Sequence, residues 1–138
     1  MRNRIHIDNG FCLVLVLGVV LAAAPARALD LNGFRRAHHL APLTMSGALS
    51  AAADEHARDL ARRNHLDHNG FRARLGPIAG TAAENVLVGC LDEACAIRVW
   101  AHSPGHRRNM LMRGVSAYGI ASATATNGRR YWVLELGN

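Results

Sequence analysis

Apolar residues repeat at helical spacing over residues 47–63, and this segment is the clearest element the sequence predicts. One stripe collects Leu49, Ala52, Ala53, His56 and Leu60. Most of the charged side chains fall on the opposite side of the same helix, which is the pattern of a helix lying on a core. Ser46 is a favourable N-cap. We therefore predict a long helix over residues 47–63 that packs one face on the interior.

Shorter helices are expected before and after this long one. Capping residues, glycines and prolines set their limits, and we place them at residues 30–39, 71–75 and 92–102. Ser103 as a cap and Pro104 at the first helical position then start a further helix that runs through Met110.

The period of the pattern changes towards the C-terminus. Residues 117–126 and 129–136 alternate as strands do, and Asn127-Gly128 between them predicts a two-residue hairpin turn. Residues 84–88 are also expected to be extended. Helices followed by a closing hairpin indicate an α+β or layered α/β domain and not a doubly wound parallel sheet.

The first 28 residues have the composition of a secretory signal peptide. Arg2 and Arg4 precede an apolar run over residues 11–24, and a small-x-small pattern ends at Ala28. A transmembrane anchor needs about 20 apolar residues, so this run is too short for a stable membrane anchor. We predict cleavage after Ala28, a mature domain over residues 29–138, and a secreted or periplasmic destination.

Two cysteines remain once Cys12 leaves with the leader. Cys90 and Cys95 can form a disulfide if the first lies in a loop and the second in the first turn of the next helix. The alternative, a C-x4-C metal site, lacks a second pair of ligands. Because exported proteins fold in an oxidising compartment, the disulfide is the favoured interpretation.

The number and distribution of charged residues indicate which classes of partner the chain can bind. The formal net charge is +6, and all of the basic residues are arginines that are scattered along the sequence. A nucleic-acid-binding protein would gather them on one face beside polar base-reading residues. We therefore expect no nucleic-acid partner, and the sequence carries no signal for a particular oligomeric state.

Three ionisable residues stand out by their position at the ends of predicted elements. His68, Glu84 and His106 each lie next to turn residues, where side chains face clefts more often than cores. Two imidazoles and a carboxylate can bind Zn²⁺ and leave an open position, or they can form a proton-shuttling site. Spacing alone does not decide between the two. Four other histidines, namely His38, His39, His56 and His65, are interpreted as structural. Among them, His56 is expected to be a hydrogen-bonded core residue.

Several catalytic motifs are missing from the sequence. Glu55-His56 does not form a His-Glu-x-x-His pair, and no Gly-x-Ser-x-Gly nucleophile elbow occurs. Cys95 is a poor nucleophile if it is oxidised. No catalytic residue is therefore assigned, and Glu84 is the one candidate.

Three sequence motifs resemble those of a known protein family. The stretch from Trp100 to Leu111, WAHSPGHRRNML, resembles the W-x-x-S-P-G-H-R-x-N-[ILM]-L signature of bacterial CAP-superfamily proteins. This superfamily includes cysteine-rich secretory proteins, insect venom antigens and plant pathogenesis-related proteins. Ala83-Glu84-Asn85-Val86 resembles its G-E-N-[IV] motif, and Tyr131-Trp132-Val133 resembles its last strand. The resemblance covers about residues 30–138.

The resemblance implies a three-layer α-β-α sandwich with a central antiparallel sheet. It also implies a cleft lined by two histidines and two acids. Position by position, the histidines are His68 and His106 and one acid is Glu84. At the position where the family has its second acid, this sequence has Ser103, which also serves as a helix cap. Of the other signature residues, we expect Trp100 in the core or the cleft wall, Arg107 paired with a carboxylate, and Asn109 bonded to a loop backbone.

Two functions are compatible with these residues. The first is an extracytoplasmic binding module whose cleft, with His68, Glu84, Ser103 and His106, takes a small-molecule or lipid ligand that is apolar or derived from the cell envelope. In this module His68 and His106 are candidate ligands of a divalent ion such as Zn²⁺. The alternative is a metal-assisted hydrolase of peptide or cell-wall material with Glu84 as the general base. A stress-related protein whose cleft does no chemistry is a third interpretation.

Overall fold

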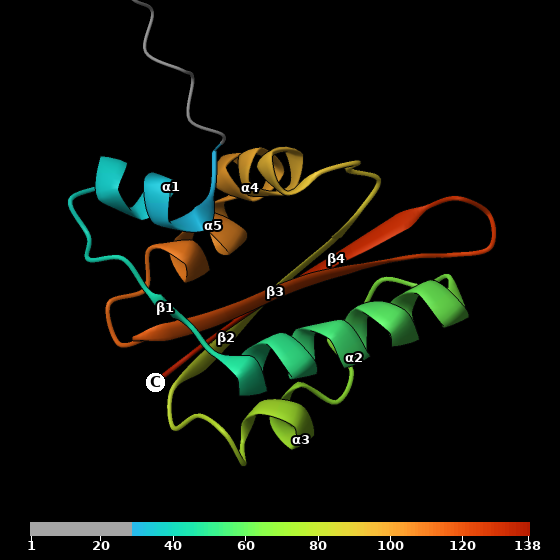
Figure 1. Ribbon diagram of the computed structural model, residues 1–138, viewed down its shortest axis with the longest axis horizontal. Coiled ribbons are helices and arrows are strands. Elements are labelled where there is room, and N and C mark those ends of the chain that lie inside the picture. Colours follow the sequence, from blue (N-terminus) through green and yellow to red (C-terminus); the bar gives the residue numbers. More distant parts are fainter. Residues whose placement is uncertain (1–28) are drawn as a thin grey trace, which may run out of the picture.

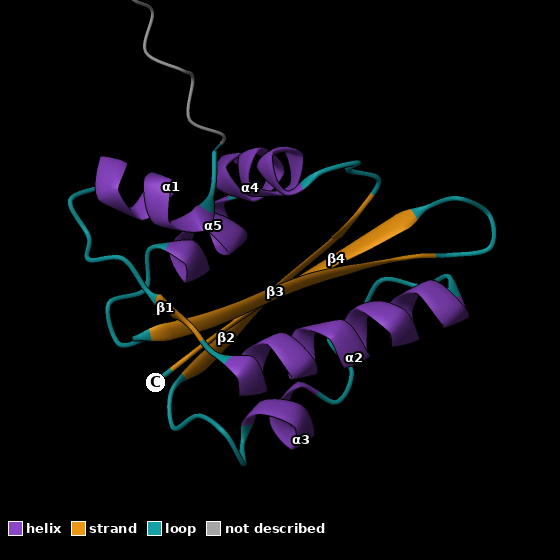
Figure 2. Ribbon diagram, in the orientation of Figure 1, coloured by secondary structure: helices purple, strands orange, loops and turns teal. Residues whose placement is uncertain are grey.

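A four-stranded sheet separates two layers of helices in the computed structural model, which describes residues 29–138 (Figures 1 and 2). In chain order the elements are α1 (Leu31–Ala37), β1 (Thr44–Met45), α2 (Gly47–Arg63), α3 (Phe71–Leu75), β2 (Ala82–Val88), α4 (Glu93–His102), α5 (Pro104–Met110), β3 (Ala117–Thr124) and β4 (Arg130–Gly137). Helices α1, α4 and α5 cover one face of the sheet, and α2 and α3 cover the other. The expected sandwich is therefore confirmed. The signal-peptide prediction, with Cys12, lies outside the described residues.

The sheet has the strand order β1-β3-β4-β2. Strand β4 pairs antiparallel with both β3 and β2, as expected. The two-residue β1 pairs parallel with β3, through Thr44 opposite Ala117. The sheet is thus mixed, with an antiparallel centre.

The hairpin between β3 and β4 differs from the two-residue turn that Asn127-Gly128 predicts. The amide of Gly128 donates to the carbonyl of Ala125 at 2.9 Å, and the amide of Ala125 donates to the carbonyl of Arg129 at 2.8 Å. These bonds close a three-residue loop over residues 126–128. Only Gly128, with φ of 83°, takes the left-handed conformation there, so the loop is a turn followed by a glycine bulge.

Local capping signals set most helix limits. Ser46 accepts from the amide of Leu49 at 3.3 Å and starts α2 at the predicted residue. The side chain of Asp92 accepts from the amide of Cys95 at 2.7 Å at the start of α4. Ser103 occupies the N-cap of α5 ahead of Pro104, but its side chain makes no capping hydrogen bond. Ser103 is thus the N-cap that the sequence predicts, but without the side-chain hydrogen bond that a serine cap usually makes.

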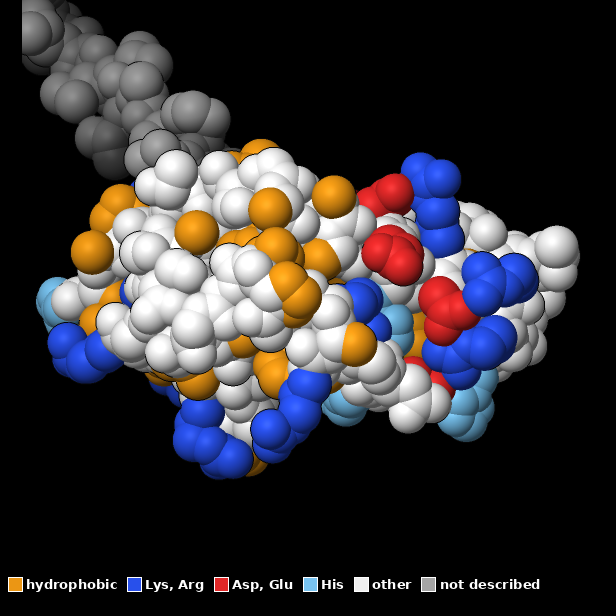
Figure 3. All heavy atoms as spheres, turned by 90° about the horizontal axis from the view of Figure 1, so that it is seen from below, with side chains coloured by type: hydrophobic (Ala, Val, Ile, Leu, Met, Phe, Trp, Pro, Cys, Tyr) orange, Lys and Arg blue, Asp and Glu red, His pale blue; other side chains and the backbone are white. Residues whose placement is uncertain are grey.

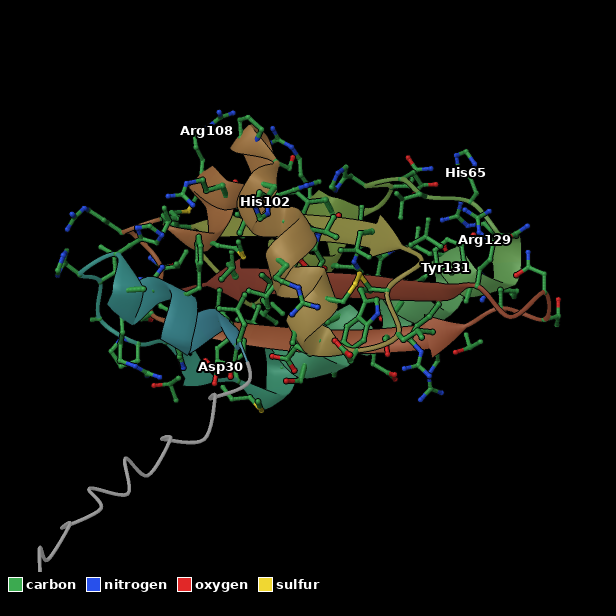
Figure 4. All side chains as sticks on the ribbon, turned by 90° about the horizontal axis from the view of Figure 1, so that it is seen from above. Asp30, His65, His102, Arg108, Arg129 and Tyr131 are labelled. Atoms are coloured by element: carbon green, nitrogen blue, oxygen red, sulfur yellow. A yellow bond between two sulfur atoms is a disulfide. The ribbon has the colours of Figure 1, made fainter. Side chains whose placement is uncertain are left out.

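The face of the sheet under α1, α4 and α5 holds the larger apolar core. Trp100 is fully buried there, and its indole N–H donates to the carbonyl of Val86 at 3.3 Å. The Cys90–Cys95 disulfide joins the loop after β2 to the first turn of α4, which confirms the predicted pairing. Figure 4 looks onto this layer, with the disulfide beside α4 and the side chain of Arg108 pointing outwards from α5.

Helix α2 packs unusually close to the other face. Its buried stripe is rich in alanine, including Ala53 and Ala57. Opposite it, a Cβ added to Gly119 of β3 would lie 2.2 Å from the carbonyl carbon of Leu49. Only glycine fits at this contact, and the close approach brings the side chains of α2 onto β2 and β4.

Among residues 29–138, no helix combines the length and apolar character needed to cross a bilayer.

Candidate functional site

A cleft of about 830 Å³ opens where the end of the sheet meets both helical layers. Its walls are formed by α3 and the loop before it, by the first residues of β2, and by α5 together with Met112. The residues that line it include His68, Phe71, Arg72, Ala82, Ala83, Glu84, Asn109 and Met112. Two of the residues singled out by the sequence, His68 and Glu84, therefore share one cleft.

His68 and Glu84 form a direct pair at the cleft wall. Nδ1 of His68 lies 2.6 Å from Oε1 of Glu84. The carboxylate accepts here, so Nδ1 carries the proton and the other ring nitrogen of a neutral His68 is left as a lone pair. The side chain of His68 is 55% exposed, whereas that of Glu84 is 1% exposed. The imidazole thus reaches solvent and the carboxylate does not.

Arg74 holds the second oxygen of the Glu84 carboxylate. Its guanidinium forms an ion pair with Oε2 and also donates to the carbonyl of Asn69 in the loop before α3. Charge-assisted bonds of this kind are the strong ones in proteins. Both oxygens of Glu84 are consequently engaged, one by His68 and one by Arg74.

His56 lies beneath this pair on α2. Its Nε2 is 3.1 Å from the carbonyl of Asp67 and 3.7 Å from Oε2 of Glu84. Because a carbonyl can only accept, Nε2 is the protonated nitrogen. Burial lowers the pKa of His56, although the charge of Glu84 opposes that shift. His56 is the hydrogen-bonded core residue that the helical stripe predicts, and it also borders the carboxylate.

A second buried acid, Glu135, faces Glu84 directly. The two residues are register partners on β2 and β4. Glu135 is 0% exposed, and neither of its carboxyl oxygens meets a hydrogen-bond donor among the described residues. The nearest cationic atom is Nε of Arg74, 3.6 Å from Oε1. A charged Glu135 would therefore be buried almost uncompensated beside another carboxylate.

Protonation removes this conflict. Burial raises the pKa of Glu135 far above its ordinary value, and so do the hydrogen bond that only a protonated Glu135 can donate to Glu84 and the negative charge of Glu84. A neutral carboxyl can donate its O–H to Glu84, which an ionised one cannot. With Glu135 protonated, the pair carries one negative charge, which the guanidinium of Arg74 balances.

His106 and Ser103 lie apart from this cluster. Nδ1 of His106 is buried without a hydrogen-bond partner in residues 29–138. Burial, and then the nearby His68, lower the pKa of His106. Neither His106 nor Ser103 is among the residues that line the cleft. The structure thus joins His68 to Glu84, places His106 within electrostatic range of His68, and leaves Ser103 at the start of α5.

Two asparagines tie α5 to the edge of the sheet. Asn109 donates to the carbonyl of Glu84 at 3.1 Å and to Oδ1 of Asn85 at 2.9 Å, and Asn85 donates to the carbonyl of His106 at 3.0 Å. Asn109 thus bonds backbone as expected, but in a strand and not a loop.

Arg107, the arginine of the signature for which a carboxylate partner is expected, has different contacts. Arg107 lies over the ring of Phe34 at 5.3 Å and 3.3 Å from Nε2 of His38, so the expected carboxylate pairing is wrong.

The fit of a metal ion can be judged from the donors that meet. Within the described part of the chain, no three His, Cys, Asp or Glu side chains come together in a way that could hold an ion. Catalytic Zn²⁺ sites use three protein ligands and structural ones use four. Nδ1 of His68 bonds Glu84 and leaves Nε2 with a free lone pair, but no two further donors of the described residues join it, so the donors present do not fit a Zn²⁺ site of either kind.

Sequence reasoning missed Arg74 and Glu135. A signal for Glu135 exists, because an acid in the middle of YWVLEL interrupts a strand that is otherwise apolar and buried. Arg74 gives no comparable signal, since an arginine on a short helix is ordinarily exposed. Its role depends on how α3 is placed against β2.

The fold and the cleft define a class of protein, and comparison with known families agrees. The model of the "Cysteine-rich secretory protein family", the CAP domain, matches residues 30–136. The chain belongs to this family.

Individual relatives extend this result. The curated protein YkwD of Bacillus subtilis, described as uncharacterized, is 27% identical over 97 residues, 64% of this chain and 38% of YkwD. The chain thus spans well under half of that relative. Among solved structures, an outer surface protein of Borrelia burgdorferi is similar with a TM-score of 0.70 and 18% identity, covering 78% of this chain and 86% of that one.

An extracellular protein of Bacillus anthracis with an SCP domain has a TM-score of 0.68 at 22% identity, covering 78% of this chain and 37% of that one. These likenesses establish the shared fold. The names of the two solved relatives place them outside the cell or on its surface.

Proposed function

We propose that the protein is an exported binding module whose cleft takes a small apolar or envelope-derived ligand. The observation that carries this proposal is the state of Glu84. Both of its oxygens are engaged and its side chain is 1% exposed, so it is poorly placed to take a proton from a substrate. The cleft beside it has the size and the mixed lining of a ligand site.

The lining divides into an apolar part and a polar part. Phe71, Ala82, Ala83 and Met112 offer apolar surface, and the exposed ring of His68 offers a hydrogen bond. Such a site binds by burying apolar area and orients its ligand through few polar contacts. Export is supported by the leader-like residues 1–28 and by the extracellular and surface names of the relatives.

The hydrolase alternative has weaker support. It requires Zn²⁺ at His68 and His106 with Glu84 as the base, and the described donors do not form a group that could hold the ion. Its one favourable feature is the unpartnered Nδ1 of His106 within residues 29–138. Zinc titration of residues 29–138 by calorimetry, with His68→Ala and His106→Ala as controls, decides the matter. Tight binding lost in both variants would support the hydrolase, and no binding would exclude its metal.

The binding proposal is tested with dansylated fatty-acid and sterol probes. Ala73→Trp places an indole in the cleft, because Ala73 is an exposed residue of α3 that lines it. Ala51→Trp is the matched control, an exposed alanine of α2 that does not line the cleft. We expect Ala73→Trp to weaken probe binding about tenfold or more, and Ala51→Trp to leave it within about twofold. Failure of a broad panel of probes to bind the unaltered protein would refute the apolar-ligand proposal.

A further inference from the structure

Strand β2 is the edge of the sheet, and its hydrogen-bond pattern shows which backbone groups face outwards. The amide of Gly89 donates to the carbonyl of Arg130 at 2.9 Å, so these two residues form a hydrogen-bonded pair. In an antiparallel ladder such pairs alternate with pairs that are not hydrogen-bonded. The backbone groups of Asn85 and Leu87 therefore point to β4, and those of Ala82, Glu84 and Val86 point away from it.

Two side chains confirm this assignment and cover part of the edge. Asn109 donates to the carbonyl of Glu84, and Trp100 donates to the carbonyl of Val86. Helices α4 and α5 thus close the middle of the edge. Covered edges of this kind prevent unwanted strand pairing.

The first part of the edge is left open. The N–H and C=O of Ala82 and the N–H of Glu84 face outwards, and no other group in residues 29–138 bonds them. Both residues line the cleft. Glu84 as a whole is 5% exposed while its side chain is 1% exposed, so its accessible area belongs to the backbone. Backbone groups at the floor of a cleft require a partner, either water or a ligand.

The charge of the cleft indicates what kind of ligand fits. Arg72 is exposed and lines the cleft beside the half-exposed His68. Among the described residues, the only acid that lines it is Glu84, whose carboxylate is buried and neutralised by Arg74. The accessible charge is therefore positive. Phe71 packs with the layer of α2 and α3, and Met112 packs with the core under α1, α4 and α5. The two residues thus belong to opposite faces of the sheet, where alternate side chains of an extended strand would be placed.

We propose that this cleft binds an extended acidic peptide segment, which adds to β2 as a further short strand at Ala82 and Glu84. The inference rests on the proposal that the cleft is a binding site, and it assigns to that site an acidic peptide in place of a small apolar ligand. Affinity comes from main-chain hydrogen bonds to the open edge, and selectivity comes from the apolar walls and Arg72. This is the mode of recognition by strand addition.

The test uses a capped pentapeptide of alternating valine and glutamate, titrated into residues 29–138. Fluorescence anisotropy gives the affinity, and amide NMR with hydrogen exchange reports on individual residues. We expect the amides of Ala82 and Glu84 to shift and to gain protection. Because only alternate amides of a strand face one edge, N-methylating one alternate set should weaken binding about tenfold, while methylating the other set should not.

Variants on the protein side complete the test. Ala82→Pro removes one outward N–H, and proline is tolerated at the first residue of a strand, so weaker peptide binding by a folded variant is expected. Arg72→Gln should reduce affinity about two- to fivefold. Arg58→Gln is its matched control, since Arg58 is exposed on α2 and does not line the cleft.

The outcomes separate the two proposals. If the lipid probes bind and no peptide does, strand addition is wrong and the binding module stands. If the peptide binds but both N-methylated forms bind equally well, recognition does not use the edge and the inference is overturned. If neither lipid nor peptide binds, both proposals fail. Should Ala82→Pro not fold, the pair of methylated peptides still decides.

Discussion

The two faces of the sheet bury very different kinds of side chain. Towards α1, α4 and α5, strand β4 presents Trp132, Leu134 and Leu136, which join a large apolar core around Trp100. Towards α2 and α3, the same strand presents Tyr131, Val133 and Glu135. The second face therefore combines a small apolar cluster with buried ionisable groups. One strand serves both faces because successive residues point to opposite sides.

The contrast separates the part of the molecule that supplies stability from the part that positions the cleft. Apolar burial on the first face is favourable without further conditions. Buried charge on the second face is costly unless every charge is compensated. Glu84 is compensated by Arg74, and Glu135 avoids the cost by keeping its proton. Figure 3 shows that the outer surface of this layer is also divided, with acidic and basic side chains gathered over the C-terminal half of α2.

The largest effect is expected from emptying the apolar face. Trp100→Ala should lower the free energy of unfolding by about 4 kcal/mol, because it leaves a cavity at a fully buried position. Urea denaturation of residues 29–138 measures it. Val99→Ala, at a neighbouring residue that is 49% exposed, should cost less than about 0.5 kcal/mol. A similar loss in both variants would contradict the division between core and surface.

A somewhat smaller loss is expected from removing the cation of the polar face. Arg74→Met leaves the Glu84 carboxylate buried without its partner and should cost about 3 kcal/mol. Adding Glu84→Gln removes that charge, so the double variant should be more stable than the sum of the two single losses predicts. Strictly additive losses would show that the pair is not coupled. Arg58→Met, which breaks an ion pair whose arginine is 72% exposed, should cost less than about 1 kcal/mol.

The smallest expected effect depends on pH and concerns Glu135. The folded state raises the pKa of this carboxyl, so it holds a proton that the unfolded state loses at about pH 4. Its stabilising contribution is full below the unfolded pKa and decreases as pH rises towards the folded pKa. His56 and the partly buried His106 have lowered pKa values and act in the opposite sense below about pH 6.5. Burial raises the pKa of Tyr118 above its ordinary value of about 10, so this residue contributes only at higher pH. The window from about pH 7 to 9 therefore isolates Glu135.

In that window the wild-type protein should lose stability with a slope of at most about 1.4 kcal/mol per pH unit. Glu135→Gln keeps a neutral side chain that can donate to Glu84, and it should flatten this slope while folding normally. Urea denaturation at a series of pH values measures both proteins. An equal slope in the two proteins would mean that Glu135 is ionised in the fold.

The helices were predictable because their signals are local. Ser46 and Asp92 cap α2 and α4 at the expected residues, since a cap depends only on the few residues beside it. The hairpin was located correctly, but its loop length was not. Asn127-Gly128 is compatible with either a two-residue or a three-residue turn, and the pairing of Ala125 with Arg129 decides which one forms.

The candidate site was predictable in part. Position at element ends and family motifs pointed to His68 and Glu84, which meet in the cleft. Arg74 and Glu135 could not be placed with them. The first lies on a five-residue helix whose orientation no local pattern fixes. The second faces Glu84 only because of the register between two strands that lie far apart in the chain.

The sequence by itself determined the family, the order of the elements, the disulfide and the pairing of apolar positions with buried faces, because these depend on local chemistry and on periodicity. The tertiary structure alone decided which ionisable groups share a buried environment and which backbone groups of β2 remain open. Protonation and hydrogen bonding depend on distance and burial, and both arise only when strands take their register and α2 settles against Gly119.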